Sequence, residues 1–352
     1  MALQYVFSVP IGPGEQPRLH QTLASLAAQP VPIQVAICHA GPKDEIADIL
    51  APYRHIISYE RHAPDAGQSA AINEGWNALE GDVYGWLNAD DALTPGALGS
   101  VSEIFNQHTG ADIVCGQSII LNEHAHFTGL HPAVRAPDHD LFRSNTISQP
   151  SCFVKRDALF AEGLVRENLH YVMDWDLWVR LMSAGREFAY TPQILSSTLW
   201  DTDTKTAKFN TARIKEIRGV VSRLNSPVTT VKTLIGHSLN KIEEYSVFSS
   251  AFKLARGFVE NGNVRKMTYW GKADLEPNWT LDFFHYETPA RGLRFHFLSP
   301  AKREIFIDGV PKAESRELTV DVSADLPSKR VHKIGIRRLD DLAPDLDYIE
   351  LV

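Results

Sequence analysis

Three polar side chains follow an apolar run in segment 86–91, Trp-Leu-Asn-Ala-Asp-Asp. The run predicts a buried strand over 83–87, with Asn88, Asp90 and Asp91 just beyond its carboxyl end, where open α/β sheets bind ligands. A Mg²⁺ or Mn²⁺ ion takes one or two carboxylates there and completes its shell with phosphate oxygens and water. Such an ion would neutralise charge on a departing diphosphate. In isolation, the same residues could equally begin the turn before the next helix.

Segment 65–75, Asp-Ala-Gly-Gln-Ser-Ala-Ala-Ile-Asn-Glu-Gly, is a second candidate. Asp65 and Gly67 predict a tight turn into a helix over 69–79, and the free N–H groups at a helix N-terminus bind anions. An ordinary strand-to-helix turn has the same composition. This segment therefore indicates a ligand site only in combination with others.

A third candidate is segment 173–181, Met-Asp-Trp-Asp-Leu-Trp-Val-Arg-Leu, at the start of a predicted helix over 176–184. Asp176 and Arg180 are four residues apart and can pair on one helix face, which leaves Asp174 to point elsewhere. A carboxylate that faces a crevice among aromatic side chains can act as a general base. The alternative is that Asp174 only caps the helix.

Alternating strands and helices must position these segments. Strands are predicted at 5–9, 33–38, 56–60 and 83–87, and helices at 19–26, 44–50, 69–79 and 94–108. Thr94 would cap the last of these helices, with Pro95 at its first position. Repeated β-α units of this length predict an α/β fold with a doubly wound, mostly parallel sheet and helices on both faces.

In the second half of the chain, the predicted secondary structure changes twice. Residues 203–272 are mostly helical in pattern, and six short strands are predicted in 273–352, at 281–284, 293–297, 304–307, 318–322, 333–337 and 348–351. Turn residues between these strands are typical of a small all-β sandwich. We therefore predict three parts, which are a catalytic domain over 1–202, a helical segment over 203–272 and a β-sandwich module over 273–352. Trp270, Trp279 and Tyr286 could bind carbohydrate or fill the core of that module.

Composition narrows the class of protein. The chain has 352 residues with a formal net charge of −8 and no long Lys/Arg run, so we expect no nucleic-acid partner. Cys38, Cys115 and Cys152 are isolated in apolar runs, which favours buried thiols in a reducing compartment. No stretch reaches the roughly 18 apolar residues of a membrane helix. We expect a cytoplasmic protein. The mixed apolar and basic segment 231–242 could form an amphipathic helix against a membrane or a partner, but packing against the catalytic domain is the favoured alternative.

Together, the three segments resemble one family. Their order and spacing are similar to those of the family 2 glycosyltransferases of the GT-A fold, and the resemblance covers about residues 3–206. The sequences of segments 82–91, 148–151 and 171–181 are the ones most similar to the usual motifs of that family. The resemblance implies a nucleotide-sugar donor, with UDP as the first choice because it is the commonest nucleotide in the family. It also implies one inverting displacement and a Mn²⁺ or Mg²⁺ ion.

The resemblance also implies roles for individual residues. Asp91 would ligate the metal that holds the donor diphosphate, and Asp90 would approach the ribose or the metal. Asn88 would shape the same strand end. Asp174 would deprotonate the acceptor hydroxyl. Pro10 and Asp65 would line the nucleoside pocket.

Two positions depart from the family pattern. His39 stands where relatives have an Asp that contacts the nucleotide base, so it is our candidate there, and the base itself is left open. Asp201 stands where relatives often have a His ahead of a Ser/Thr-Lys-Thr segment, and it could meet the metal. A loop Asp that only caps the next helix would have the same position.

Three functions are compared. The leading one is transfer of a sugar to a saccharide or lipid-linked saccharide acceptor in the synthesis of a bacterial surface polysaccharide. A sugar nucleotidyltransferase would need a Gly-rich loop with basic residues after the first strand. Segment 10–15 contains no Lys or Arg, and the first basic residue after it is Arg18. A non-catalytic glycan-binding protein on a transferase-like fold is the third possibility, motivated by His39 and Asp201.

Overall fold

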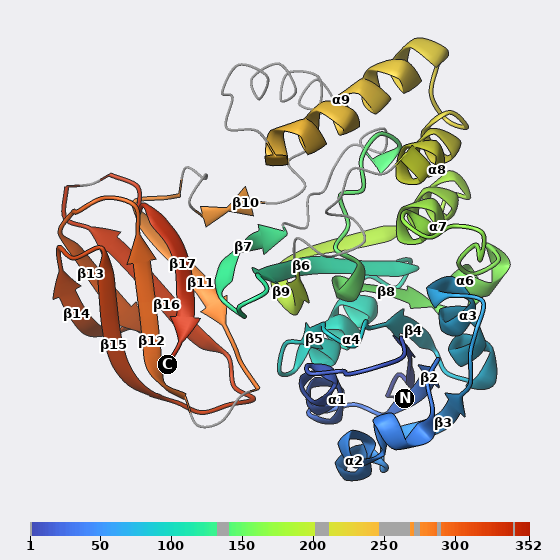
Figure 1. Ribbon diagram of the computed structural model, residues 1–352, viewed down its shortest axis with the longest axis horizontal. Helices are drawn as coiled ribbons and strands as arrows, with labels where there is room; N and C mark the ends of the chain where they lie inside the picture. Colours follow the sequence, from blue (N-terminus) through green and yellow to red (C-terminus); the bar gives the residue numbers. More distant parts are fainter. Residues whose placement is uncertain are drawn as a thin grey trace.

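The structure is a computed structural model. It describes residues 2–131, 141–200, 211–245, 268–270, 275–286, 290–340 and 342–352, without the side chains of 239–245 and 268–269. Figure 1 shows a larger α/β part that holds the N-terminus and a smaller part made of strands that holds the C-terminus.

A parallel sheet forms the centre of the α/β part. Its strands are β1 (Tyr5–Ile11), β2 (Ile33–His39), β3 (Ile57–His62) and β4 (Val83–Trp86), in the order β3-β2-β1-β4. All seven residues of β1 are buried, as expected for a strand covered by helices on both faces. The α/β class and the mostly parallel sheet were predicted, and both are confirmed.

Further strands extend this sheet beyond β4. They are β8 (Cys152–Lys155), β6 (Ile113–Leu121), β7 (Phe127–His131), β9 (Phe188–Leu199) and the short β5 (Ala92–Leu93). Strands β8, β6 and β7 continue the sheet in antiparallel pairs, while β9 runs parallel to β6 and also pairs with β5.

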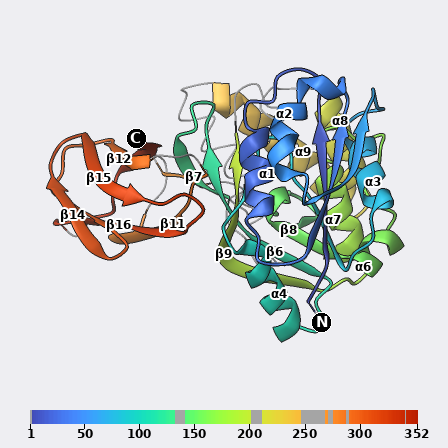
Figure 2. The same ribbon diagram turned by 90° about the horizontal axis from the view of Figure 1, so that it is seen from below.

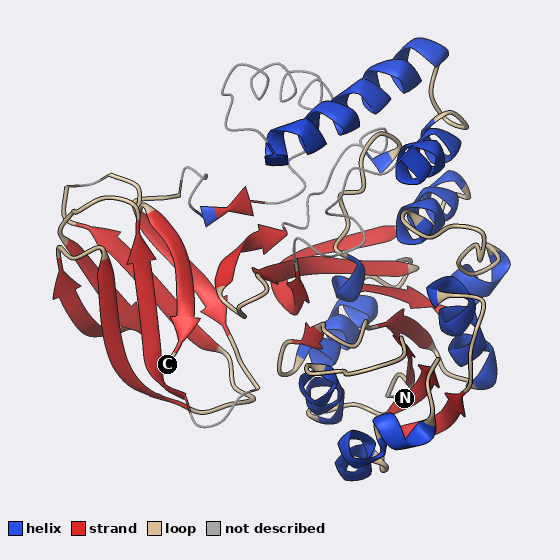
Figure 3. Cartoon of the chain, in the orientation of Figure 1, coloured by secondary structure: helices blue, strands red, loops and turns tan. Residues whose placement is uncertain are grey.

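Helices cover both faces of the sheet, as Figure 3 shows. They are α1 (Leu19–Ala27), α2 (Ala47–Leu50), α3 (Gln68–Ala78), α4 (Ala97–Gln107), α6 (Arg156–Ala161) and α7 (Met173–Ser183). Short 3-10 turns lie at Lys43–Glu45, Ala51–Tyr53 and Gln149–Ser151. Side chains of α1 and α4 pack with Phe7 of β1, whereas those of α3, α6 and α7 pack with Val6 on the opposite face.

The predicted cap at Thr94 is wrong. Helix α4 begins at Ala97 after Gly96, which has a φ of 79°. The Thr94 hydroxyl instead donates a 2.8 Å hydrogen bond to the carbonyl of Ile194 in β9. The pairing of β5 with β9 occupies this stretch, so the helix starts one turn later.

The C-terminal strands form two packed sheets. One consists of β11 (Asn278–Phe283), β16 (His332–Arg338), β13 (Arg303–Ile307) and β14 (Val310–Ser315). The other consists of β15 (Thr319–Leu326), β12 (Ala290–Phe297) and β17 (Leu346–Leu351). Strand β14 was not predicted, because this edge strand is largely exposed and lacks the apolar alternation of its neighbours. Trp270, Trp279 and Tyr286 are buried in the core, so none offers an exposed surface for carbohydrate.

The two parts share a sheet. Strand β17 pairs with β7 at Ile349 and Phe127, and the short β10 (Thr268–Tyr269) also pairs with β7. Figure 2 shows the C-terminal strands beside β7. Both predicted domain boundaries, at 202 and 272, fall outside the described residues.

Helices α8 (Thr211–Val221) and α9 (Pro227–Tyr245) belong to the predicted helical segment and lie beyond α7 (Figure 1). Among the described residues, no helix has both the length and the apolar character needed to span a membrane. Cys38, Cys115 and Cys152 are buried free thiols, as predicted.

Candidate active site

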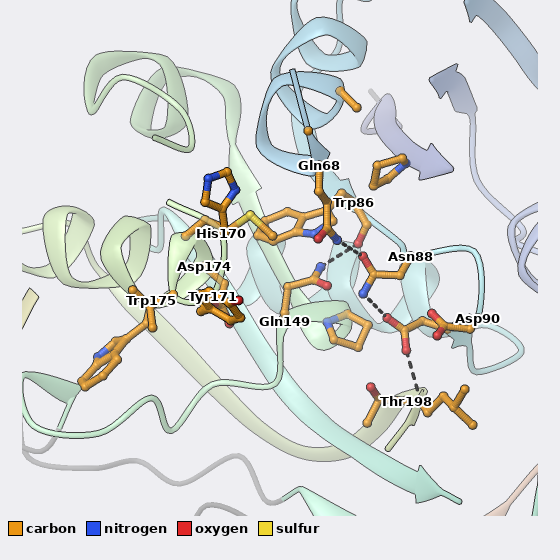
Figure 4. A pocket seen from close by; sticks show the side chains of 18 of the residues that line it. Gln68, Trp86, Asn88, Asp90, Gln149, His170, Tyr171, Asp174, Trp175 and Thr198 are labelled. Carbon is orange, nitrogen blue, oxygen red and sulfur yellow. Dashed lines mark hydrogen bonds between the residues drawn. The ribbon is translucent and has the colours of Figure 1, made fainter. Parts of the chain in front are cut away.

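A cleft of about 730 Å³ opens at the carboxyl ends of β1 and β4. It is bounded by residues 10–13 at the end of β1, by the end of β4, by the start of α7 and by the end of β9. Six of the predicted site residues line it: Pro10, Asp65, Asn88, Asp90, Asp91 and Asp174. Figure 4 shows that Asn88 and Asp90 come from one side of this space and Asp174 from the other.

A chain of hydrogen bonds holds the strand end that carries the carboxylates. The Gln68 amide donates to the side-chain oxygen of Asn88 at 2.7 Å, and the Asn88 amide donates to Asp91 at 3.0 Å (Figure 4). The backbone N–H of Leu199 donates to the other carboxylate oxygen of Asp91 at 3.3 Å. Helix α3, strand β4 and strand β9 therefore fix the orientation of one carboxylate.

Burial sets the charge preference of this strand end. Asp91 is almost completely buried, and burial together with the neighbouring Asp90 raises its pKa well above the usual range. Burial also raises the pKa of Asp90, and the Arg18 guanidinium acts in the opposite direction. Two adjacent carboxylates that are costly to ionise together favour a bound cation, which would offset the repulsion between them.

The residues fit a small hard cation that shares its shell with phosphate. The described part of the chain contains no cluster of three or more His, Cys, Asp or Glu side chains able to hold a metal. Mg²⁺ commonly takes only one or two carboxylates and completes its octahedron with substrate phosphates and water, so Asp90 and Asp91 suffice. The other predicted ligand, Asp201, lies outside the described residues.

Asp174 enters the cleft from the first turn of α7. Its carboxylate accepts a 2.7 Å hydrogen bond from the side-chain amide of Asn145. The segment that carries Asn145 is held to the sheet through Gln149, whose amide donates to the carbonyl of Trp86 at 2.7 Å (Figure 4). Trp175, next to Asp174, donates from its indole to the carbonyl of Leu141 at 2.6 Å. The candidate base is therefore held on a packed helix rather than on a free loop.

Asp176 has the structural position that the spacing predicts. It is fully buried and pairs with Arg180 at 2.8 Å. Arg166 lies 3.1 Å from the same carboxylate, and Arg223 also pairs with it. This cluster fastens α7 to its neighbours and leaves Asp174 facing the cleft.

Asp65 forms the predicted turn at the start of α3. One carboxylate oxygen accepts the N–H of Gly67 at 2.8 Å, and the other pairs with Arg61 at 2.9 Å. Gly67 has a φ of 118°, a conformation that side-chain-bearing residues rarely adopt. The turn leaves Asp65, Gly67 and Gln68 on the wall of the cleft.

Comparison with known proteins agrees with this geometry. Residues 14–160 match the sequence model of glycosyl transferase family 2. This segment is a family 2 glycosyltransferase domain. It contains the Asp65 turn and the Asp90–Asp91 strand end.

Two curated relatives match the same half of the chain. An uncharacterised glycosyltransferase of Rickettsia typhi is 24% identical over 191 residues, which are 51% of this chain and 58% of the relative. An uncharacterised glycosyltransferase of Rickettsia prowazekii is 26% identical over 161 residues, covering 42% of this chain and 49% of the relative. The chain thus spans only about half the length of the curated relatives it matches.

The glycosyltransferase fold is also found among solved structures. Residues 1–349 of TarS from S. aureus, in complex with UDP-GlcNAc, superpose with a TM-score of 0.51 at 13% identity. The match covers 74% of this chain and 76% of that one. At this identity the comparison shows the GT-A fold, as predicted, and no more.

His39 is not brought into the cleft of the family 2 domain. Its side chain is fully buried, with one ring nitrogen 3.3 Å from His62 and the other 3.3 Å from Glu45. Burial lowers the pKa of His39. The next residue, Ala40, lines the cleft instead, so a base contact from His39 finds no support in this geometry.

Two residues that the sequence analysis did not single out belong to the site. Asn145 contacts the candidate base, and Arg213 of α8 lines the cleft. Arg213 is the only Lys or Arg among the described residues that do so. Neither belongs to a recognisable motif, and both reach the site only through the packing of distant segments.

Proposed function

We propose that the protein transfers a sugar from a nucleotide-sugar donor, a UDP-sugar, to a saccharide or lipid-linked saccharide acceptor. Transfer would invert the anomeric carbon in one displacement, on the cytoplasmic side of the membrane, during synthesis of a bacterial surface polysaccharide. One observation carries the proposal, namely that the Asp90–Asp91 pair and Asp174 enter the same cleft from separate elements. This separation suits a reaction in which one group leaves and another attacks from the opposite side.

The donor side of the cleft is the Asp90–Asp91 strand end with the Asp65 turn. A Mn²⁺ or Mg²⁺ ion bound by Asp91 and Asp90 would supply positive charge to the departing diphosphate. Pro10 and Asp65 lie where a nucleoside would be held, and Asn88 keeps Asp91 oriented. UDP is proposed because it is the commonest nucleotide of the family, and TarS, which has the same fold, binds UDP-GlcNAc.

Arg213 is proposed to contact the diphosphate. A guanidinium keeps its charge at any working pH and can bind phosphate oxygens in a bidentate manner. Because Arg213 lines the same cleft as Asp90 and Asp91, it would put a fixed positive charge into the space that the diphosphate would occupy. An Arg213→Lys variant would keep the charge and lose the bidentate geometry.

The acceptor side is Asp174 with Asn145. The Asp174 carboxylate would take the proton of the acceptor hydroxyl as its oxygen forms a bond to the anomeric carbon and the bond from that carbon to the diphosphate breaks. Asn145 holds the carboxylate by a 2.7 Å hydrogen bond, which limits its rotation. A preset orientation saves the entropy of aligning base and nucleophile.

The decisive test compares Asp174→Asn with a matched control. Asp174→Asn should abolish transfer from a labelled donor while leaving nucleotide binding intact. Asp157→Asn replaces an exposed first-turn carboxylate of α6 and should leave transfer unchanged. Full transfer by Asp174→Asn would contradict the role of the base. Any sugar transferred to an acceptor by the wild type would exclude a purely glycan-binding protein.

Thermal melting tests the donor side separately. A ligand that binds only the folded state raises the melting temperature. UDP with Mn²⁺ should stabilise the wild type, and Asp91→Ala should lose that gain. GDP, CMP and dTDP, each with and without Mn²⁺, complete the series. If none of the four nucleotides stabilises the protein, the proposal of a metal-assisted transferase is wrong.

A further inference from the structure

Among the described side chains of α9, three apolar ones face solvent and three polar ones are buried, while Leu234 packs against the core. Val228, Val231 and Ile235 are 66%, 56% and 42% exposed. Thr230, Thr233 and His237 are buried instead. A surface helix packed only against its own protein has the opposite arrangement. The exposed residues therefore mark a face that something else covers.

The exposed residues share one face. Their spacings of three and four residues place them along a single side of a helix with about 3.6 residues per turn. Lys232 lies beside them and is also exposed. Leu224, in the turn before α9, is 40% exposed and extends the apolar area. We call Leu224, Val228, Val231, Lys232 and Ile235 the α9 face.

The inner side of α9 is fixed on the acceptor side of the site. The ring Nε2 of His237 donates to the carbonyl oxygen of Arg143 at 3.1 Å, and the ring lies 5.7 Å from that of Trp175. Trp175 follows the candidate base in α7. These contacts define which side of α9 faces inward, so the apolar side cannot turn into the core without breaking them.

The charge around the α9 face is positive although the chain is acidic overall. Residues 211–238 contain five Lys or Arg residues and one acidic residue, Glu216, in a chain of net charge −8. Arg213 lines the cleft and Arg223 pairs with Asp176, so the cations that this surface can present are Lys215, Arg218 and Lys232. Lys215 and Arg218 of α8 are exposed. Glu216 accepts the backbone N–H groups of His170 and Tyr171, at 3.1 Å and 2.9 Å, and so is used within the protein.

We propose that the α9 face docks on an anionic phospholipid surface. Apolar side chains would enter the boundary between head groups and acyl chains, while Lys232, Lys215 and Arg218 meet the negative head groups. Without this local positive charge, a chain of net charge −8 would be repelled by such a surface.

Charge also argues against a second copy of the chain as the occupant. A two-fold dimer through this face would bring the α9 face of one copy against that of the other. The exposed Lys215, Arg218 and Lys232 of one copy would then lie near those of the other, and residues 211–238 contain no exposed acidic side chain to compensate. An anionic bilayer meets both the apolar and the basic residues.

The position of α9 suggests how membrane docking would serve the reaction. This step of the inference rests on the proposed transfer reaction. Helix α8 packs against both α7 and α9, and its residues Arg213 and Ile217 line the cleft. Figure 1 shows α9 at the outer edge of the molecule, beyond α8. A bilayer against the α9 face would lie on the side of the molecule where α7 and α8 border the cleft. The acceptor class it favours is a saccharide carried on a membrane lipid.

Vesicle co-sedimentation tests the proposal with the full chain. The wild type should sediment with vesicles of phosphatidylcholine mixed with phosphatidylglycerol, and not with phosphatidylcholine alone. Val231→Ser/Ile235→Ser should reduce binding more than tenfold, and Lys232→Gln should reduce it about fivefold, the effect of one basic residue near an anionic surface. Val310→Ser/Leu318→Ser, which replaces similarly exposed apolar residues of the C-terminal module, should bind as the wild type does.

Each outcome decides the matter. No binding of the wild type to the anionic vesicles, or equal binding by Val231→Ser/Ile235→Ser, would overturn the proposal. Loss of a dimer by the same variant in light scattering would replace the bilayer with a second copy. Stabilisation of every variant by UDP and Mn²⁺ in thermal melting shows that folding and the donor site are intact. Failure of membrane docking is thereby separated from failure of the proposed reaction.

Discussion

The side-chain amide of Asn145 donates a 2.7 Å hydrogen bond to the carboxylate of Asp174. The two residues are 29 positions apart in the chain and come from different segments. The hydrogen bond leaves the amide oxygen of Asn145 for the backbone N–H of Ile147, at 3.3 Å. Asn145 therefore links the fold of its own segment to the orientation of the candidate base, and we assign it a positioning role.

Asn145→Ala should lower kcat about tenfold and leave the donor KM nearly unchanged, because a hydrogen bond to a charged group contributes about 1.5–3 kcal/mol. Steady-state kinetics with separate donor and acceptor titrations would show this split. Asn77→Ala, which removes an amide that donates to the carbonyl of Asn73 on α3, is the control and should keep the wild-type kcat. An equal rise in donor KM with unchanged kcat would assign Asn145 to binding instead.

Asp91 makes the metal-free protein sensitive to pH. Burial and Asp90 raise its pKa, so the folded chain keeps a proton that the unfolded chain has released above about pH 4. The free energy of unfolding contributed by this group therefore falls as pH rises from that value to the folded pKa, by at most about 1.4 kcal/mol per pH unit. Asp91→Asn lacks the titrating carboxyl group.

Urea unfolding in the presence of a chelator would measure this effect. The stability of Asp91→Asn relative to the wild type should increase as pH rises through the window, since only the wild type must ionise a buried carboxyl group. Mn²⁺ with UDP should remove the difference by stabilising the wild type alone. A difference that stays constant with pH would mean that Asp91 has the same pKa in both states.

Asp176 should matter for stability rather than for chemistry. It is fully buried among Arg166, Arg180 and Arg223, and its removal leaves these cations without their shared partner. Asp176→Ala should cost about 3 kcal/mol in the free energy of unfolding, because breaking a buried ion pair strands the remaining charge. Chemical denaturation would measure it, with exposed Asp157→Ala as a control that changes little. A loss under 1 kcal/mol would show that the arginines find water or other partners.

The parts of the site that could be predicted depend on local sequence. Asp90 and Asp91 follow a buried strand, and Asp174 begins a helix, so short segments are enough to place them at the edge of a parallel sheet. The pairing of Asp176 with Arg180 follows from helical spacing alone. For these residues, secondary structure and chemistry are encoded within the same few positions.

The remaining parts depend on packing between distant segments. Asn145 reaches Asp174 because the amide of Gln149 is hydrogen-bonded to the carbonyl of Trp86. These two residues are 63 positions apart in the chain. His39 ends a strand as expected, yet its side chain turns toward His62 and Glu45, away from the cleft. An amphipathic helix was one alternative for segment 231–242, but the sequence could not say that Thr230, Thr233 and His237 face inward. That choice is made by contacts with Arg143 and Trp175.

The C-terminal module is joined to the catalytic part by a buried hydrogen bond. The hydroxyl of Tyr286 donates to the carbonyl of Leu93 at 2.6 Å, and burial raises the pKa of this phenol. Leu93 lies in β5, two residues after Asp91, and β5 pairs with β9, which carries Leu199. The N–H of Leu199 donates in turn to Asp91. The module thus supports the strand that leads away from Asp91.

Tyr286→Phe should therefore lower both stability and metal-dependent nucleotide binding. The lost hydrogen bond should cost about 1 kcal/mol in the free energy of unfolding. Loosening of β5 should raise the Mn²⁺ concentration needed for stabilisation by UDP, which a melting titration would measure. Tyr348→Phe is the control, since this tyrosine of the same module stacks on His126 and His296 and does not contact β5. If Tyr286→Phe loses stability but keeps the wild-type Mn²⁺ dependence, the module stabilises the fold without orienting Asp91.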